Sequence, residues 1–341
     1  MRRTTKWGLG LGVGVPALAI ALGSLQLRLQ SARLRSAVEQ DGSRPVPQPA
    51  LRIDRSTGRG TPLTESRADE DLPAVAVLGD SWVAGLDVGS RRRTQGMLVA
   101  RGVARLVGED VRLRVVAAPS AGADDLLGQV STVLADRRMR RSRTGAGEPR
   151  YAVVSMGTAD LVHPISGTIG LPVLSTVINR LQREGGYRVI VLTVPNLGLL
   201  PSIGRPLRDV LRRSSRVLSG SQWLTAVSTG ALPVSLNQTL AGTTRIGLVS
   251  SGGRYPSLLG CAQLAAAIVR RIAEDLAAPV AIAPGTEPTE HPAEGPADDL
   301  AEHLTEGPAE EPIPAPGADP APAAGDPAPA SAAADPEESS A

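Results

Sequence analysis

Residues 74–85 read AVAVLGDSWVAG, and this stretch decides the fold that the sequence predicts. Its first five residues are apolar without alternation, which is typical of a β-strand covered on both faces. Gly79, Asp80 and Ser81 follow at once, so polar groups stand where the strand ends. Three similar apolar runs come later, at residues 111–118, 151–155 and 187–194.

Helical periods separate these runs. One apolar stripe consists of Leu174, Val177, Ile178 and Leu181, and it stops at Gly185-Gly186, a natural helix end. Another stripe consists of Ala265, Ile268, Val269, Ile272 and Leu276. The alternation predicts an α/β fold with a parallel sheet flanked by helices, in which reactive groups lie at the carboxyl ends of the strands.

Composition divides the chain. Its 341 residues hold 36 Lys and Arg against 34 Asp and Glu, yet residues 279–341 contain no Lys or Arg and 14 of the acids. Segments that cannot bury enough apolar surface stay disordered. We predict a basic segment with a hydrophobic anchor or signal (1–25), a disordered stalk (26–71), one domain (72–278) and a disordered acidic tail rich in Pro and Ala (279–341).

Residues 7–25 form an uncharged, mostly apolar run behind Arg2, Arg3 and Lys6. Nineteen such residues suit a membrane-spanning helix, and no convincing small-x-small cleavage pattern follows Leu25. We therefore expect an uncleaved membrane anchor with the domain outside the cytoplasm. If the run is cleaved as a signal peptide, the protein is secreted.

The composition also excludes several kinds of site. The single cysteine, Cys261, rules out an internal disulfide, and we expect it to be buried and inert. The domain offers no cluster of metal ligands, so we expect neither a metal nor an organic cofactor. Three Trp, three Tyr and no Phe argue against a nucleic-acid partner bound by base stacking. The sequence gives no indication of the oligomeric state.

Polar blocks follow the apolar runs, at residues 79–81, 119–122 and 157–160, and a last block at 252–257 precedes the final helix. Four blocks in this order resemble the SGNH (GDSL-type) hydrolase family, over essentially all of residues 72–278. The resemblance implies a three-layer, flavodoxin-like fold and hydrolysis of lipid, acyl-sugar or other esters. It also implies that Ser81 is the nucleophile and that the backbone N–H of Gly122 helps to hold an oxyanion.

Three of the family's catalytic groups are replaced. Its third-block Asn, last-block Asp and last-block His fall on Ala159, Gly252 and Tyr255. A serine hydroxyl is a weak nucleophile without a base, and a phenol with a pKa near ~10 stays protonated at neutral pH. We therefore expect a catalytically impaired, membrane-anchored hydrolase-like protein that binds an acyl ester or another component of the cell envelope.

His163 offers an alternative, since it is the one histidine before the acidic tail. Residues 160–164 read DLVHP, the spacing expected of the last block but placed in the third. In this reading the protein is an active esterase, with His163 as a relocated base oriented by Asp160. In the other reading His163 is a surface or helix-start residue, and Pro164 opens the next segment. Independently of His163, we expect Asp80 to bond backbone N–H groups of a tight turn.

Overall fold

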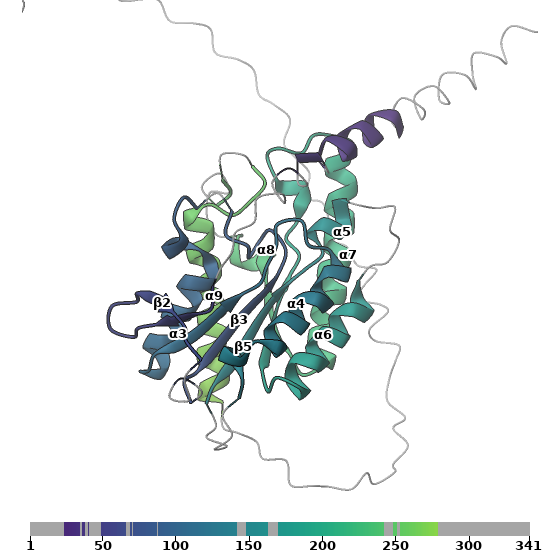
Figure 1. The fold of residues 1–341 in the computed structure, drawn as a ribbon. Helices are drawn as coiled ribbons and strands as arrows, with labels where there is room; N and C mark the ends of the chain where they lie inside the picture. Colours follow the sequence, from purple (N-terminus) through teal and green to yellow (C-terminus); the bar gives the residue numbers. More distant parts are fainter. Residues whose placement is uncertain are drawn as a thin grey trace, which may run out of the picture. The chain divides into compact units, whose positions relative to one another are not determined.

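The computed structural model describes residues 24–34, 36–37, 40, 49–65, 69, 71–86, 88–141, 148–162, 170–241, 248–250 and 253–278. By its contacts the chain divides into residues 1–280, which include every described residue, and residues 281–341. A seven-stranded sheet lies at the centre of the first unit, with helices on both of its faces (Figure 1). The strands are β1 (Leu51–Ile53), β2 (Gly60–Pro62), β3 (Ala74–Gly79), β4 (Val111–Val115), β5 (Arg150–Ser155), β6 (Arg188–Thr193) and β7 (Leu232–Ser235).

The sheet has the order β2-β1-β4-β3-β5-β6-β7, and the strands from β4 to β7 run parallel. All residues of β3 and β5 are buried, which explains their continuous apolar sequences. The four apolar runs of the sequence correspond to β3, β4, β5 and β6. The predicted three-layer α/β fold is thus confirmed. The α-helices are α3 (Gln95–Val107), α4 (Ala123–Ala135), α5 (Thr158–Val162), α6 (Leu171–Arg183), α7 (Leu207–Ser228), α8 (Leu236–Thr239) and α9 (Leu258–Ala277).

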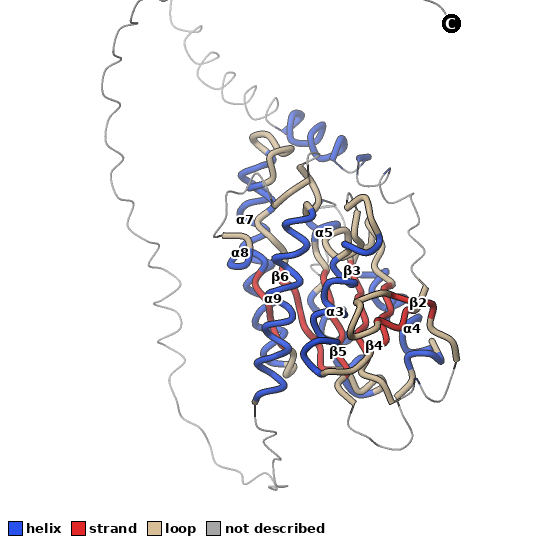
Figure 2. The backbone as a smooth tube through the Cα atoms, turned by 90° about the vertical axis from the view of Figure 1, so that its left-hand side faces the viewer, coloured by secondary structure: helices blue, strands red, loops and turns tan. Residues whose placement is uncertain are grey.

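Alternate residues of the central strand β3 enter two different cores. Val75 and Val77 pack with residues of α3 and α9 on one face of the sheet. Ala76 and Leu78 pack with residues of α4 and α6 on the other face. Figures 1 and 2 show these helix layers on either side of the strands. The carboxyl ends of the parallel strands lie between these layers, so the segments that follow the strands can form a site.

The amino-terminal part of the sheet corrects one prediction. Residues 26–71 are predicted above as a disordered stalk, yet β1 and β2 lie within this range and join the sheet. β1 pairs with β4 through Leu51 and Leu113, and Ile53 is completely buried. Each of the two strands has only three residues, so no periodic pattern in the sequence reveals them. The folded domain therefore begins before residue 72.

Residues 24–34 form a further helix, called the N-terminal helix below. It lies beyond the ends of the strands, beside the amino-terminal end of α7 (Figures 1 and 2). Leu27 and Leu34 pack against the core. No helix among the described residues is long and apolar enough to cross a membrane. The predicted anchor at residues 7–25 lies almost entirely outside the described residues.

Candidate functional site

Ser81 lies in the turn that follows β3, and the side chain of Asp80 holds this turn. One carboxylate oxygen of Asp80 accepts hydrogen bonds from the backbone N–H of Trp82 (3.1 Å) and the hydroxyl of Ser155 (3.0 Å). The other oxygen accepts from the backbone N–H of Thr158 at 3.2 Å. Burial raises the pKa of the Asp80 carboxyl. The prediction that Asp80 holds the backbone of a tight turn is confirmed.

Gly79, two residues before Ser81, is fixed from both sides. The side-chain amide of Gln129 in α4 accepts from the Gly79 N–H (2.6 Å) and donates to the Gly79 carbonyl (3.0 Å). Gly79 has a φ of 130°, and a Cβ at this position would lie 1.8 Å from the carbonyl oxygen of Ser155. Only glycine allows β3 and β5 to approach so closely at this point.

A cavity of about 30 Å³ lies beside Ser81, whose side chain is nearly buried. It brings together residues from all four blocks, which are far apart in the sequence. Among the described residues, none forms a hydrogen bond with the Ser81 hydroxyl. The described lining consists of Leu34, Ser81, Pro119, Thr158, Ala159, Leu197, Leu200, Ile203, Arg254 and Tyr255.

The last block contributes a phenol and a cation to this cavity. Tyr255 stands where the family has its catalytic His, and its side chain is buried. The Arg254 guanidinium lies 5.8 Å from the centroid of the Tyr255 ring. Of the described residues that line the cavity, Arg254 alone carries a charge. A guanidinium keeps its protons in proteins, so it cannot act as the base for Ser81.

The backbone N–H of Gly122 already has an acceptor. Gly122 is the N-cap of α4, and its N–H donates to the carboxylate of Asp125 at 3.0 Å. An oxyanion that used this donor would have to displace a carboxylate that carries the same charge. The spacing of an N-cap and an acid three residues later is a recognisable signal in the sequence.

Asp160 lies beside the second block and outside the lining of the Ser81 cavity. Its carboxylate accepts a hydrogen bond from the backbone N–H of Ala123 at 3.1 Å. A Cβ on Gly122 would lie 3.1 Å from the same oxygen. His163 and Gly252 fall outside the described residues. The pairing of Asp160 with His163 therefore stays a prediction.

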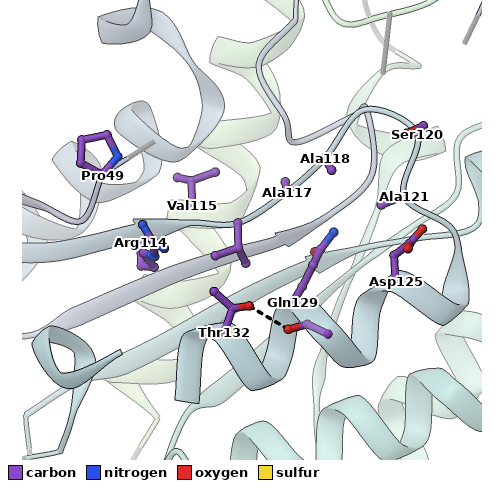
Figure 3. A pocket seen from close by; sticks show the side chains of 12 residues that line it. Pro49, Arg114, Val115, Ala117, Ala118, Ser120, Ala121, Asp125, Gln129 and Thr132 are labelled. Atoms are coloured by element: carbon purple, nitrogen blue, oxygen red, sulfur yellow. Dashed lines mark hydrogen bonds between the residues drawn. The ribbon is translucent and has the colours of Figure 1, made fainter. Parts of the chain in front are cut away.

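A larger groove of about 720 Å³ lies between β4 and α4, on the surface next to the second block. Ser120 and Asp125 stand at one end of it, and Arg114 and Pro49 at the other (Figure 3). Arg114 forms an ion pair with Asp136 at 3.3 Å. The groove approaches the Gly122 loop but does not include Ser81.

Within the described ranges, no three His, Cys, Asp or Glu side chains gather as metal ligands. Cys261 is buried, and burial raises the pKa of its thiol to about 11. The prediction of a buried, inert thiol agrees with this environment.

Several site residues were not singled out in the sequence. Asp125 carries the capping signal described above, whereas Gln129 lies in the middle of a helix with no local signal. Thr158 and Arg254 stand inside recognised blocks but outside the positions that the family resemblance names. Leu34 comes from a segment remote in sequence, so only the tertiary structure reveals it.

No family model matches the chain. A GDSL-like esterase of Mycobacterium tuberculosis is 30% identical over 183 residues, which cover 52% of this chain and 54% of the relative. The chain thus matches about half of the length of this curated relative.

Solved structures of similar fold include a lipase/acylhydrolase from Enterococcus faecalis, with 22% identity, a TM-score of 0.46, and coverage of 60% of this chain and 97% of that one. They also include a variant of an acetyl xylan esterase from Geobacillus stearothermophilus, with 14% identity, a TM-score of 0.43, and coverage of 59% and 96%. The chain is thus similar in sequence to a curated GDSL-like esterase, in agreement with the resemblance of its four blocks to the SGNH (GDSL-type) hydrolase family.

Proposed function

We propose that this protein is a membrane-anchored, hydrolase-like member of the SGNH (GDSL-type) family. It binds an acyl ester or another cell-envelope component but is catalytically impaired. One observation carries the proposal. Ser81 shares its cavity with Ala159 and Tyr255 at the positions of the family's oxyanion Asn and catalytic His. The nucleophile thus remains while its partners are replaced.

The expected loss of activity is large. Without its catalytic base, a serine hydrolase keeps only about 10³–10⁴-fold acceleration over water, from the oxyanion hole and substrate binding. Each oxyanion donor contributes roughly 10²–10³ in kcat. Here one donor is replaced by Ala159, and the N–H of Gly122 is bonded to Asp125. The contribution of the oxyanion hole is therefore weakened as well.

A fluorophosphonate probe tests the proposal, because it labels only an activated serine. We expect no labelling of the folded wild-type protein above the level of a Ser81→Ala variant. A serine esterase of known activity is the positive control. Labelling of the wild type that disappears in Ser81→Ala would contradict the impairment.

The alternative function is an active esterase with His163 as base. The observation that favours it is the position of α5, which begins with Thr158 in the Ser81 cavity and ends at Val162, one residue before His163. Labelling that is lost in both Ser81→Ala and His163→Ala, and kept in His291→Ala, would establish this function. The last variant is a matched control in the acidic tail.

The membrane location is tested separately. Residues 7–25 support an anchor by their length and lack of charge. We expect the full chain to stay in the membrane fraction after alkaline extraction, and a chain without these residues to be released. We also expect protease added outside intact cells to reach the domain.

A further inference from the structure

Two glutamine side chains fasten the N-terminal helix to the domain. Gln30 donates from its side-chain amide to the carbonyl of Arg205 at 2.8 Å, and it accepts from the backbone N–H of Leu207 at 3.2 Å. Gln26 reaches the same carbonyl at 3.4 Å. These bonds join the helix to the loop before α7, at the partly exposed surface of the domain.

Leu34 makes the same helix a wall of the Ser81 cavity. It lines the cavity together with residues of the domain that include Ile203 and Leu200. The cavity holds about 30 Å³ with this wall in place, enough for only about two water molecules. An acyl ester is much larger, so a ligand that reaches Ser81 needs the cavity to widen. Leu34 is the one described lining residue that belongs to the N-terminal helix.

The opposite face of the helix is apolar and basic. Leu25 and Leu29 are 54% and 51% exposed, and Arg28 and Arg33 are exposed beside them. Residues 24–34 contain no acid. Such a combination of exposed leucine and arginine is typical of helices that lie in a membrane interface.

The neighbouring surface carries the same charge. Residues 205–217 contain five arginines and one acid, Asp209, which pairs with Arg205 at 3.6 Å. Arg208 and Arg212 are exposed on this part of α7. A two-fold contact with a second copy would bring these arginines against one another, which like charges oppose. Anionic lipid is the partner whose charge is complementary.

We propose that the outward face of the N-terminal helix docks on an anionic membrane surface, and that docking lifts Leu34 from the Ser81 cavity. The partner is a lipid surface, and the apolar run at residues 7–25 leads directly into this helix. The inference rests on the Ser81 cavity being the functional site. It concerns access to the cavity, so it holds for a binding protein and for an esterase alike.

The test measures access to the cavity without catalysis. The full chain with Ser81→Cys is placed in vesicles of phosphatidylcholine, or of phosphatidylcholine with a quarter of phosphatidylglycerol, and modified with a water-soluble thiol reagent. The unsubstituted chain has only the buried Cys261 and supplies the blank. We expect modification about tenfold faster in the anionic vesicles, since each arginine near such a surface contributes about fivefold.

Two sets of variants separate the inner and outer faces. Gln30→Ala should speed modification about five- to tenfold in neutral vesicles, because two hydrogen bonds that hold the helix are lost. Arg28→Gln with Leu29→Ser should remove the acceleration by anionic lipid. Arg105→Gln with Leu106→Ser, a matched pair at the far end of α3 with Leu106 41% exposed, should leave it unchanged.

Trypsin gives a second measurement on the unsubstituted chain, in case Ser81→Cys does not fold. Cleavage after Arg28 and Arg33 should slow when the outward face is covered by anionic lipid, and cleavage after Arg105 should not change. Equal modification and equal cleavage in both kinds of vesicle would overturn the proposal. The proposal would also be overturned if deletion of residues 279–341 accelerated the thiol modification while lipid had no effect. The acidic tail would then be the partner of the outward face. Fluorophosphonate labelling tests the proposed function independently of these outcomes.

Discussion

The carboxylate of Asp125 accepts a hydrogen bond of 3.0 Å from the backbone N–H of Gly122. This bond begins α4 and at the same time occupies a donor that the family uses to hold an oxyanion. Asp125 stabilises the start of α4, and its carboxylate would compete with an oxyanion for the N–H of Gly122.

Replacing Asp125 with Ala should lower the free energy of unfolding by about 1 kcal/mol. The change removes a cap hydrogen bond and a negative charge at a helix N-terminus. Asp124→Ala is the matched control, since Asp124 lies in the same helical turn and no bond to Gly122 is present. We expect it to cost only a few tenths of a kcal/mol. Urea denaturation measures both, and equal losses would show that the Gly122 bond contributes nothing.

Gly79→Ala should prevent folding or cost more than about 4 kcal/mol. Its Cβ would lie 1.8 Å from a backbone oxygen in β5, and neither strand can move away inside the sheet. Gly89→Ala is the control, because Gly89 also has a positive φ (61°) but no atom within 4 Å of the added Cβ. That variant should cost about 1–2 kcal/mol. Circular dichroism during thermal unfolding distinguishes the two results.

Asp80 should make the protein less stable as the pH rises. Burial raises the pKa of its carboxyl above the ordinary value of 3.8, so above that pH the folded state retains a proton that the unfolded state has lost. Stability therefore falls from pH 3.8 upward until Asp80 ionises in the folded protein. In Asp80→Asn this contribution is absent. The difference in unfolding free energy between Asp80→Asn and wild type should shift in favour of the variant with rising pH, and a constant difference would refute the assignment.

Cys261 should resist alkylation in the folded protein. Its thiol is 2% exposed, and burial raises the thiol pKa to about 11, so little thiolate forms near neutral pH. Iodoacetamide at pH ~8 should react at least ~100-fold more slowly than with the protein in urea, where the pKa returns to about 8.5. N-acetylcysteine under both conditions corrects for the effect of urea on the reagent. Rapid alkylation of the folded chain would mean that α9 opens locally.

The long buried strands could be predicted from the sequence, while the short edge strands could not. β3 and β5 are buried on both faces, so their apolar runs are continuous and unmistakable. β1 depends on Ile53 and on pairing with β4, which is 60 residues away in sequence, and three residues carry no periodicity. Proline and glycine around β1 and β2 indicate disorder when each segment is considered alone. Long-range pairing outweighs this local preference.

The candidate site divides in a similar way. Ser81, Ala159 and Tyr255 stand in three of the blocks that the sequence places at the strand ends, and the cavity contains all three. Leu34 and Gln129 reach the site from other elements through packing, which no local pattern records. The bond of Asp125 to Gly122 has a sequence signal, but the same spacing begins many helices. The bond matters here because the N-cap of α4 is Gly122.

The turn that carries Ser81 is held by Asp80, Gln129, Ser155 and Thr158, and none of these stands at a replaced catalytic position. The architecture therefore does not depend on the reaction. Catalytic residues could be lost during evolution without loss of the fold, and the same fold could hold them again. Re-equipping the chain with Ala159→Asn, Gly252→Asp and Tyr255→His is thus a reasonable starting point for an engineered esterase.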